Sequence, residues 1–230
     1  MEKFEASRIL YEDNHLIVVN KISGDIVQGD KTGDKPLSEI VSEYIAQRDN
    51  KPGAAFLGVP HRIDRPVSGI ALFAKTSKAL ERMNELFRCG DIQMKYWALV
   101  GVKPTVTAAE LRGNITRNEK QNKSYISDSP KQGSKEAILR YKLLKSSDNY
   151  HLLEVELITG RHHQIRAQLA HMGSPIKGDL KYGAPRSNPD GSISLHARSI
   201  RFVHPVKKIE IYVEAPAPEE SLWNWFSKNI

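Results

Sequence analysis

The chain has 230 residues, of which 40% are hydrophobic and 27% charged, and its 34 lysines and arginines outnumber 27 acidic residues to give a net charge of +7. This composition predicts a globular protein with its own core and excludes a disordered chain. No apolar run approaches the roughly 20 residues of a membrane span, and the first residues lack the pattern of a signal peptide, so we expect a cytoplasmic protein without a membrane partner. We also expect a monomer. The single cysteine, Cys89, excludes an internal disulfide and a multi-thiolate metal site, and we expect it to be packed.

The first sixty residues predict two strands followed by a helix. The β-branched runs at Arg8–Tyr11 and Leu16–Asn20 are typical of strands. Apolar residues at helical spacing follow Pro36, a residue suited to the first turn of a helix. The predicted apolar face consists of Leu37, Ile40, Val41, Tyr44 and Ile45. Such a face is expected to pack against a sheet.

Residues 61–69 form the most unusual segment of the chain. One carboxylate, Asp64, stands among His61, Arg62 and Arg65, directly before the apolar run of residues 70–74. A loop salt bridge between Asp64 and a neighbouring arginine would account for this pattern without any function. An ionised carboxylate in positive surroundings could also act as a nucleophile or a base, and the same surroundings would attract phosphate. Both interpretations stay open at this point.

The next residues predict a strand, a helix and a second strand. The strands are Gly69–Lys75 and Tyr96–Val100, both rich in apolar residues. The helix is expected to follow Thr76 and Ser77 and to end near Gly90. Its predicted buried face consists of Leu80, Met83 and Phe87.

Positive charge is concentrated in residues 112–145, which carry nine lysines and arginines against three acidic residues. The segment is also rich in Ser, Asn, Gln and Gly, so it predicts loops or hairpins that project from a core. Such a basic surface can contact a polyanion, although an ordinary solvated surface is the simpler interpretation.

A second polar cluster, Thr159–Arg166, leads into a helix predicted over His163–Met172. The N–H groups and the positive dipole end of this helix, beside Arg161, can hold a phosphate or a carboxylate. Arg166 lies away from the apolar face of the helix, where it could reach Asp64. This cluster is therefore a second candidate for chemistry.

Nothing in the sequence predicts a metal or a cofactor. His162, His163 and His171 are close in sequence, but adjacent histidines diverge on a helix and no His-Glu-x-x-His pattern is present. Phosphate-binding loops of nucleotide and dinucleotide sites are also missing from the sequence. We therefore expect chemistry that uses side chains alone.

The remaining strand signals, at Leu152–Leu157 and Ile209–Val213, complete the pattern. The strands are too many and too irregularly spaced for repeated βαβ units. We expect an α+β fold with a large, mainly antiparallel or mixed sheet flanked by helices and loops. No repeat or long linker divides the chain, so we expect a single domain over residues 1–230.

Four motifs in order resemble those of the RluA family of pseudouridine synthases, over nearly the whole chain. Residues 61–69 resemble the segment around the catalytic aspartate of that family, and residues 96–100 resemble the strand with its active-site tyrosine. Residues 159–166, followed by residues 178–183, are similar to the motif with the basic partner of the aspartate. The family's closing strands resemble residues 195–205. The resemblance implies the pseudouridine synthase catalytic fold.

The resemblance also implies an enzyme that isomerises uridine to pseudouridine in structured ribosomal or transfer RNA, without a cofactor. Asp64 would be the essential acid residue, Tyr96 would stack on the detached uracil, and Arg166 would pair with Asp64. Arg62 would fill the space left by a flipped base. Because Leu10 of the first motif lies so near the start, we expect no separate N-terminal RNA-binding module.

Further residues of the two clusters are candidates for substrate binding, each with a simpler alternative. The histidines would bind RNA phosphate or only satisfy local hydrogen bonds, and the apolar residues would shape the pocket floor or only pack. Tyr96 itself would be assigned to the core without the resemblance. The candidates are His61, Arg62, Arg65, Arg161, His162, His163, Ile165 and Leu169.

Two other functions are alternatives to an RNA pseudouridine synthase. A non-catalytic RNA-binding protein on the same fold would have no use for a carboxylate in a phosphate-facing segment. A hydrolase of sugars or phosphodiesters generally needs two carboxylates, and Asp64 alone stands in a motif. Pseudouridine formation is therefore the favoured prediction.

Overall fold

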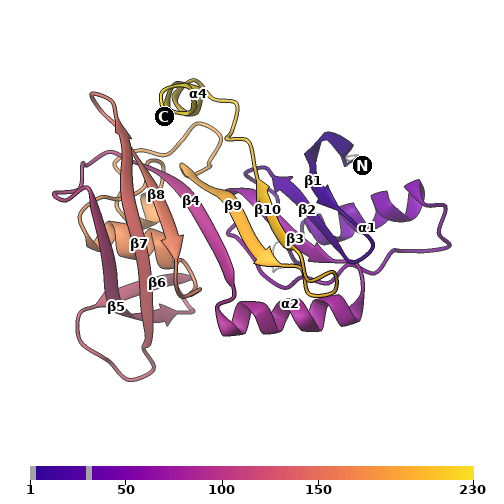
Figure 1. Ribbon diagram of the computed structural model, residues 1–230. Helices are drawn as coiled ribbons and strands as arrows, with labels where there is room; N and C mark the ends of the chain where they lie inside the picture. Colours follow the sequence, from indigo (N-terminus) through magenta and orange to yellow (C-terminus); the bar gives the residue numbers. More distant parts are fainter. Residues whose placement is uncertain (1–3, 30–32) are drawn as a thin grey trace. The chain divides into compact units, whose positions relative to one another are not determined.

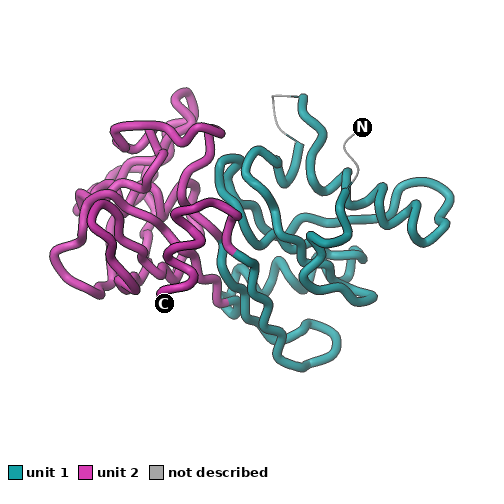
Figure 2. Tube along the Cα trace, turned by 90° about the horizontal axis from the view of Figure 1, so that it is seen from above, with its two compact units in different colours: residues 1–92, 197–216 teal, residues 93–196, 217–230 magenta. Residues whose placement is uncertain are grey.

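The computed structural model describes residues 4–29 and 33–230, which form ten strands and four α-helices. The chain divides into two compact units (Figure 2). Unit 1 comprises residues 1–92 and 197–216, and unit 2 comprises residues 93–196 and 217–230. The single domain over residues 1–230 stays a prediction.

Unit 1 contains strands in the order β1-β2-β3-β9, with β10 paired to β9 (Figure 1), and the β1–β2, β2–β3 and β9–β10 pairs are antiparallel. Every residue of β3 is buried, as is the apolar run Leu16–Val19 of β2, which is the pattern of strands covered on both faces. The strands predicted at residues 8–11, 16–20, 69–75 and 209–213 are confirmed within one residue at each end. Their bounds are β1 Ile9–Glu12, β2 Leu16–Lys21, β3 Ser68–Ala74, β9 Leu195–Val203 and β10 Glu210–Glu214.

The helices of unit 1 begin and end where local sequence signals place them. The helix predicted after Pro36 is α1 (Leu37–Arg48), and the helix predicted after Thr76 is α2 (Ser77–Cys89). The Thr76 side chain accepts the backbone N–H of Ala79, and Gly90 ends α2 in the left-handed conformation at φ 78°. Both helices are therefore confirmed. A short 3₁₀ helix, Ala6–Arg8, precedes β1.

The expectation that Cys89 is packed is wrong, because this residue is exposed. It lies at the last position of α2, whose buried side chains are Ala79 and Met83. The Cys89 thiol contacts the carboxylate of Glu85, one turn earlier, with Sγ and Oε1 3.1 Å apart. Its helix position therefore turns it away from the core.

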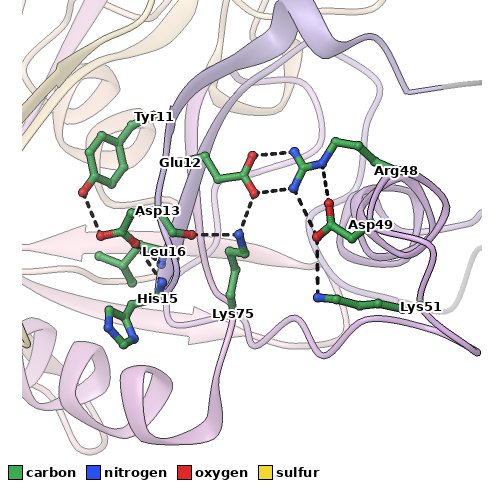
Figure 3. Close-up of polar contacts among 9 residues, drawn as sticks. All are labelled: Tyr11, Glu12, Asp13, His15, Leu16, Arg48, Asp49, Lys51 and Lys75. Carbon is green, nitrogen blue, oxygen red and sulfur yellow. Dashed lines mark hydrogen bonds and ion pairs between the residues drawn. The ribbon is translucent and has the colours of Figure 1, made fainter.

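Glu12, at the end of β1, ties together two distant segments of unit 1 (Figure 3). Its carboxylate accepts two hydrogen bonds from the Arg48 guanidinium at the end of α1, at 2.7 and 2.8 Å. The ammonium group of Lys75 donates to the same carboxylate at 2.6 Å and to the backbone carbonyl of Asp13 at 2.7 Å. These contacts join α1, the β1–β2 turn and the residue after β3.

Gly69, the second residue of β3, is required by a close approach within unit 1. Its φ is 105°, and a Cβ atom at this position would lie 2.3 Å from the carbonyl oxygen of Ala197 in β9. Any larger residue would therefore combine backbone strain with a clash against backbone. This constraint fixes the start of β3, directly after the segment that carries Asp64.

Unit 2 contains antiparallel strands in the order β4-β8-β7-β5-β6 (Figure 1). The basic stretch 112–145, expected as loops or hairpins, lies in the hairpins of β5, β6 and β7, where polar and apolar residues alternate along β5. The predicted strands at residues 96–100 and 152–157 are confirmed as parts of longer elements. The bounds are β4 Ile92–Val100, β5 Ala108–Asn118, β6 Lys123–Ser127, β7 Lys135–Ser146 and β8 His151–Leu157.

Two helices complete unit 2. The predicted helix at residues 163–172 is α3 (Gln164–His171), flanked by His163 and Met172 as caps. The helix α4 (Ser221–Lys228) was not predicted, and a 3₁₀ turn, Leu180–Tyr182, follows α3. The aromatic side chains of α4 join a buried cluster with β4 and β8, formed by Trp97, Leu99, Leu152, Trp223 and Phe226. The helices and antiparallel strands confirm the α+β class.

Candidate active site

Asp64 lies in a tight turn directly before β3. Its backbone carbonyl accepts the N–H of Val67 at 3.0 Å, which closes the turn. Ile63 and Val67 are buried on either side of it, whereas Arg62 and Arg65 are exposed. The sequence Ile-Asp-Arg-Pro-Val thus folds with its apolar residues inward and leaves the Asp64 side chain partly exposed between two cationic side chains.

Arg65 has an ion-pair partner in unit 1. Its guanidinium lies 2.7 Å from a carboxylate oxygen of Asp34, and both side chains are about half exposed. A pair in this setting is screened by solvent and contributes little to stability. The exposed Arg65 guanidinium can therefore exchange this carboxylate for an RNA phosphate at low cost, and phosphate binding by Arg65 stays a prediction.

His61 satisfies a local hydrogen bond. Its Nε2 atom accepts the backbone N–H of Leu72 in β3 at 3.0 Å, and its ring stacks on Phe87 of α2 at a centroid distance of 5.1 Å. Burial lowers the pKa of His61 to about 4, so the ring is neutral near pH 7. A neutral ring with its Nε2 occupied supports the local alternative for His61 over phosphate binding.

Tyr96 lies on β4 of unit 2, directly opposite Val155 of β8. Its side chain is 6% exposed, and its hydroxyl group lies 3.9 Å from the sulfur of Met94. The short strand predicted around Tyr96 is thus part of a buried sheet, and the ring is held by packing. Contact with a uracil stays a prediction for this residue.

Arg166 is buried in α3 and forms an ion pair that the sequence did not predict. Its Nε and Nη2 atoms donate to the two carboxylate oxygens of Asp179 at 2.7 and 2.9 Å. Both side chains are nearly inaccessible to solvent, at 6% and 1% exposure. This two-point geometry fixes the plane of the guanidinium. The predicted pairing of Arg166 with Asp64 is not tested by these contacts, because Asp64 belongs to unit 1 and Arg166 to unit 2.

Tyr182 gathers several polar groups of unit 2 around one ring. Its hydroxyl group accepts the backbone N–H of Ser124 at 2.8 Å and lies 3.0 Å from Nδ1 of His163. The cationic groups of Lys123 and Arg166 each lie 5.1 Å from the centre of its ring. Tyr182 therefore supports Arg166 from a second side, in addition to Asp179.

The two adjacent histidines also have partners within unit 2. Their rings stack at a centroid distance of 3.8 Å, and Nδ1 of His162 lies 2.8 Å from the Ser124 hydroxyl group. His163 precedes α3 in the left-handed conformation at φ 54°, which is uncommon for a residue with a side chain. Its contact with Tyr182 and its stacking stabilise this backbone. Both rings thus have hydrogen-bond partners within unit 2, and phosphate binding by either ring stays a prediction.

The other candidates of this cluster serve the start of α3. The backbone N–H of Arg161 and the hydroxyl group of Thr159 both donate to the side-chain carbonyl of Gln164, at 3.0 and 2.9 Å. The Arg161 side chain is exposed, and its Nε donates to the Glu136 carbonyl at 3.0 Å. Ile165 and Leu169 are buried, which supports packing as their role.

The structure places the candidate residues in two groups. His61, Arg62, Asp64 and Arg65 belong to unit 1, and the remaining candidates belong to unit 2. The described residues, 4–29 and 33–230, contain no group of three or more His, Cys, Asp or Glu that could hold a metal ion. Sequence reasoning missed two features: the pairing of Asp179, a residue of the third motif, with Arg166, and the role of Lys21, whose ammonium group contacts the backbone after Asp64.

Comparison with known proteins identifies the family. The model of the family described as RNA pseudouridylate synthase matches residues 15–171, which include Asp64, Tyr96 and Arg166. The chain belongs to this family. The resemblance to RluA-type pseudouridine synthases is thereby confirmed.

Relatives of the RNA pseudouridylate synthase family match most of the chain. Ribosomal large subunit pseudouridine synthase C of Haemophilus ducreyi is 36% identical over 214 residues, which cover 90% of this chain and 65% of the relative. The protein of the same name from Rickettsia felis is 34% identical over 219 residues, which cover 94% of this chain and 70% of the relative. The chain spans about two thirds of the length of the curated relatives that it matches.

Two solved structures share the fold. Human RNA Pseudouridylate Synthase Domain Containing 4 superposes with a TM-score of 0.80 at 23% identity, over 96% of this chain and 92% of that chain. Human RNA Pseudouridylate Synthase Domain Containing 1 gives a TM-score of 0.69 at 19% identity, over 99% and 97% of the two chains. These likenesses establish the pseudouridylate synthase fold.

None of the helices of the described residues is long and apolar enough to cross a membrane.

Proposed function

We propose that the protein is an RNA pseudouridine synthase that acts on ribosomal RNA of the large subunit. The observation that carries the proposal is the turn of Asp64 between the exposed Arg62 and Arg65, inside the segment that matches the family. The choice of RNA rests on relatives named as ribosomal large subunit pseudouridine synthases. Transfer RNA is the alternative substrate, and a non-catalytic RNA-binding protein is disfavoured because binding needs no carboxylate beside phosphate-facing cations.

The reaction needs a carboxylate and a closed pocket, and it needs no redox partner. The N1–C1′ bond of uridine breaks, the uracil turns, and a C5–C1′ bond forms, while the C5 proton is lost and N1 gains one. Asp64 would supply the essential carboxylate, by attack on C1′, by attack on the base, or by removal of a ribose proton. All three routes use Asp64 as a carboxylate, and Arg62 and Arg65 flank it in the turn.

The residues of unit 2 have separate roles in the proposed reaction. Tyr96 would stack on the detached uracil and keep it in place. Arg166 would pair with Asp64 and hold its orientation. Arg62, which is exposed, would enter the space left when the uridine flips out of its helix.

The basic hairpins of β5, β6 and β7 would contact the RNA backbone. Some of their charge is neutralised within the sheet, because Arg112 and Arg140 both pair with Glu110. Lys120, Lys131 and Lys135 are exposed and lie in or beside the hairpin turns. We propose that these lysines supply the salt-sensitive part of RNA binding.

The experiment that tests the proposed function is tritium release from RNA labelled with 5-³H-uridine. Large-subunit ribosomal RNA and total transfer RNA from cells that lack the gene are incubated with the purified protein. We expect release from ribosomal RNA, because the unmodified target uridine is present there. Release from transfer RNA alone would show that transfer RNA is the substrate. Release from neither RNA would contradict the proposed function.

A further inference from the structure

Lys21, the last residue of β2, carries a completely buried ammonium group. Its side chain is 0% exposed, and Nζ donates to three backbone carbonyls: Ile22 at 3.0 Å, Arg65 at 3.0 Å and Val67 at 2.6 Å. An ammonium group has three N–H donors, so these carbonyls use all of them. A buried lysine whose three N–H donors all bind backbone carbonyls stabilises the conformation of that backbone.

Two of these acceptors belong to the backbone that directly follows Asp64. The carbonyl of Arg65 also accepts the N–H of Gly24 at 3.0 Å, and the N–H of Val67 donates to the carbonyl of Asp64 at 3.0 Å. The turn is thus tied to the end of β2 by Lys21 and to the following loop by Gly24. Removal of the Lys21 ammonium would leave the carbonyls of Arg65 and Val67, the latter buried, without that donor.

His61 holds the backbone on the other side of Asp64. Its Nε2 accepts the N–H of Leu72 in the centre of β3, and its ring packs on Phe87 of α2. The segment from His61 to Val67 is therefore attached to the sheet before Asp64 by an imidazole and after Asp64 by an ammonium group. The three residues between His61 and Arg65 include Asp64, the carboxylate of the proposed reaction.

We propose that Lys21 and His61 are positioning residues that fix the backbone of Asp64 from its two sides. The proposal deepens the proposed function and rests on it for its catalytic consequence. Neither side chain needs to touch the RNA for this role. A displacement of about 1 Å at a reacting group can cost on the order of 10²-fold in rate, so a held backbone is worth a large factor in turnover.

The charges around Lys21 determine the pH at which the anchor is complete. Burial lowers the pKa of Lys21 to about 7, Asp25 and Asp64 raise it, and Arg8 and Arg65 lower it further. The neutral amine has two N–H donors, one fewer than the three carbonyls need. The anchor is therefore complete below about pH 7, and its test belongs near pH 6.

The test compares Lys21→Met with a matched control, Lys75→Met. Lys75 also lies in unit 1, is largely buried, and donates to a backbone carbonyl, that of Asp13 (Figure 3). It directly follows β3, whereas Asp64 precedes this strand. Two quantities are measured near pH 6: hydrogen exchange of the Val67 amide, and the single-turnover rate constant at saturating RNA. We expect Lys21→Met to speed exchange of Val67 and to lower the rate constant by on the order of 10²-fold, with RNA affinity unchanged.

We expect the control, Lys75→Met, to lower the free energy of unfolding without changing the exchange of the Val67 amide or the single-turnover rate constant. Exchange of Val67 that is equally slow in wild type and in Lys21→Met would overturn the proposal, and this readout needs no activity. An inactive wild type would instead contradict the proposed function, and the exchange measurement would still decide the anchor. If Lys21→Met fails to fold, the decision falls to His61.

For His61 the two variants are His61→Leu and His61→Gln. Glutamine keeps an acceptor near the position of Nε2, and leucine removes it. We expect His61→Leu to lower the single-turnover rate constant at unchanged RNA affinity, and His61→Gln to restore most of it. Equal rates in the two variants and the wild type, or equal losses in both variants, would contradict a positioning role for His61.

Discussion

Arg166 of α3 and Asp179 of the following loop form a two-point ion pair that is almost completely buried, with N–O distances of 2.7 and 2.9 Å. A side chain held in this way has little freedom to turn. Tyr182, whose ring lies against the same guanidinium, restricts it further. The arginine that we propose as the partner of Asp64 is thus oriented by its own unit before any RNA binds.

Two replacements of Arg166 should distinguish the contribution of its charge from that of its two-point geometry. Arg166→Ala leaves the Asp179 carboxylate buried without its partner, which typically costs about 3–5 kcal/mol of unfolding free energy. Arg166→Lys keeps the charge and loses the two-point geometry, so its loss should be smaller. Urea unfolding measures the stability, and single-turnover assays at saturating RNA measure the activity. Negligible losses in both variants would show that neither the pair nor the proposed contact with Asp64 matters.

The exposed lysines of the basic hairpins should govern the salt dependence of RNA binding. Replacement of Lys120, Lys131 and Lys135 with Gln should raise the dissociation constant and flatten its salt dependence, by roughly 0.7 in slope for each lost contact on single-stranded RNA. Lys123 is left in place because its ammonium group packs on Tyr182. The rate constant at saturating RNA should stay unchanged.

The control for this variant removes the same charge from unit 1, at the exposed residues Lys35, Lys51 and Lys78. We expect its salt dependence to equal that of the wild type. Binding curves over a salt series distinguish the two triple variants. An equal slope in both would mean that the hairpin lysines are only a solvated surface.

The buried imidazole of His61 should make the stability of the fold depend on pH in the acid range. Its pKa is about 4 in the folded protein and 6.5 as the ordinary value, so the unfolded chain binds more protons between these limits. The stabilisation is complete above pH 6.5 and is lost as the pH falls toward 4, by up to about 1.4 kcal/mol for each pH unit. Denaturant unfolding of the wild type and His61→Gln measures it. We expect a flatter pH dependence in the variant, and parallel curves would contradict a buried neutral His61.

The elements that the sequence predicted are those with strong local signals. Thr76 and Gly90 bracket α2 because a side-chain cap and a left-handed end are set by neighbouring residues. The strand β3 is an apolar run that is buried on both faces. The helix α4 was missed because it is short, and the packing of Trp223 and Phe226 on β4 and β8 stabilises it rather than a local signal.

The parts of the candidate site that the sequence did not predict depend on contacts between distant segments. A lysine at the end of a strand is normally solvated, and Lys21 is buried only because residues 44 and 46 positions later supply its acceptors. Asp179 stood in a recognised motif, but its pairing with Arg166 follows from the path of the loop after α3. Asp64 was found because its neighbours in sequence are also its neighbours in the turn.

The most direct test of the account is Asp64→Asn, which keeps the shape of the side chain and removes its charge. With Asp49→Asn as the control, an exposed aspartate of the same unit, tritium release from 5-³H-uridine RNA is measured in single turnover, and RNA affinity is measured separately. We expect Asp64→Asn to lose activity by on the order of 10⁴-fold or more while it binds RNA like the wild type. Turnover of Asp64→Asn near the wild-type rate would contradict the central claim.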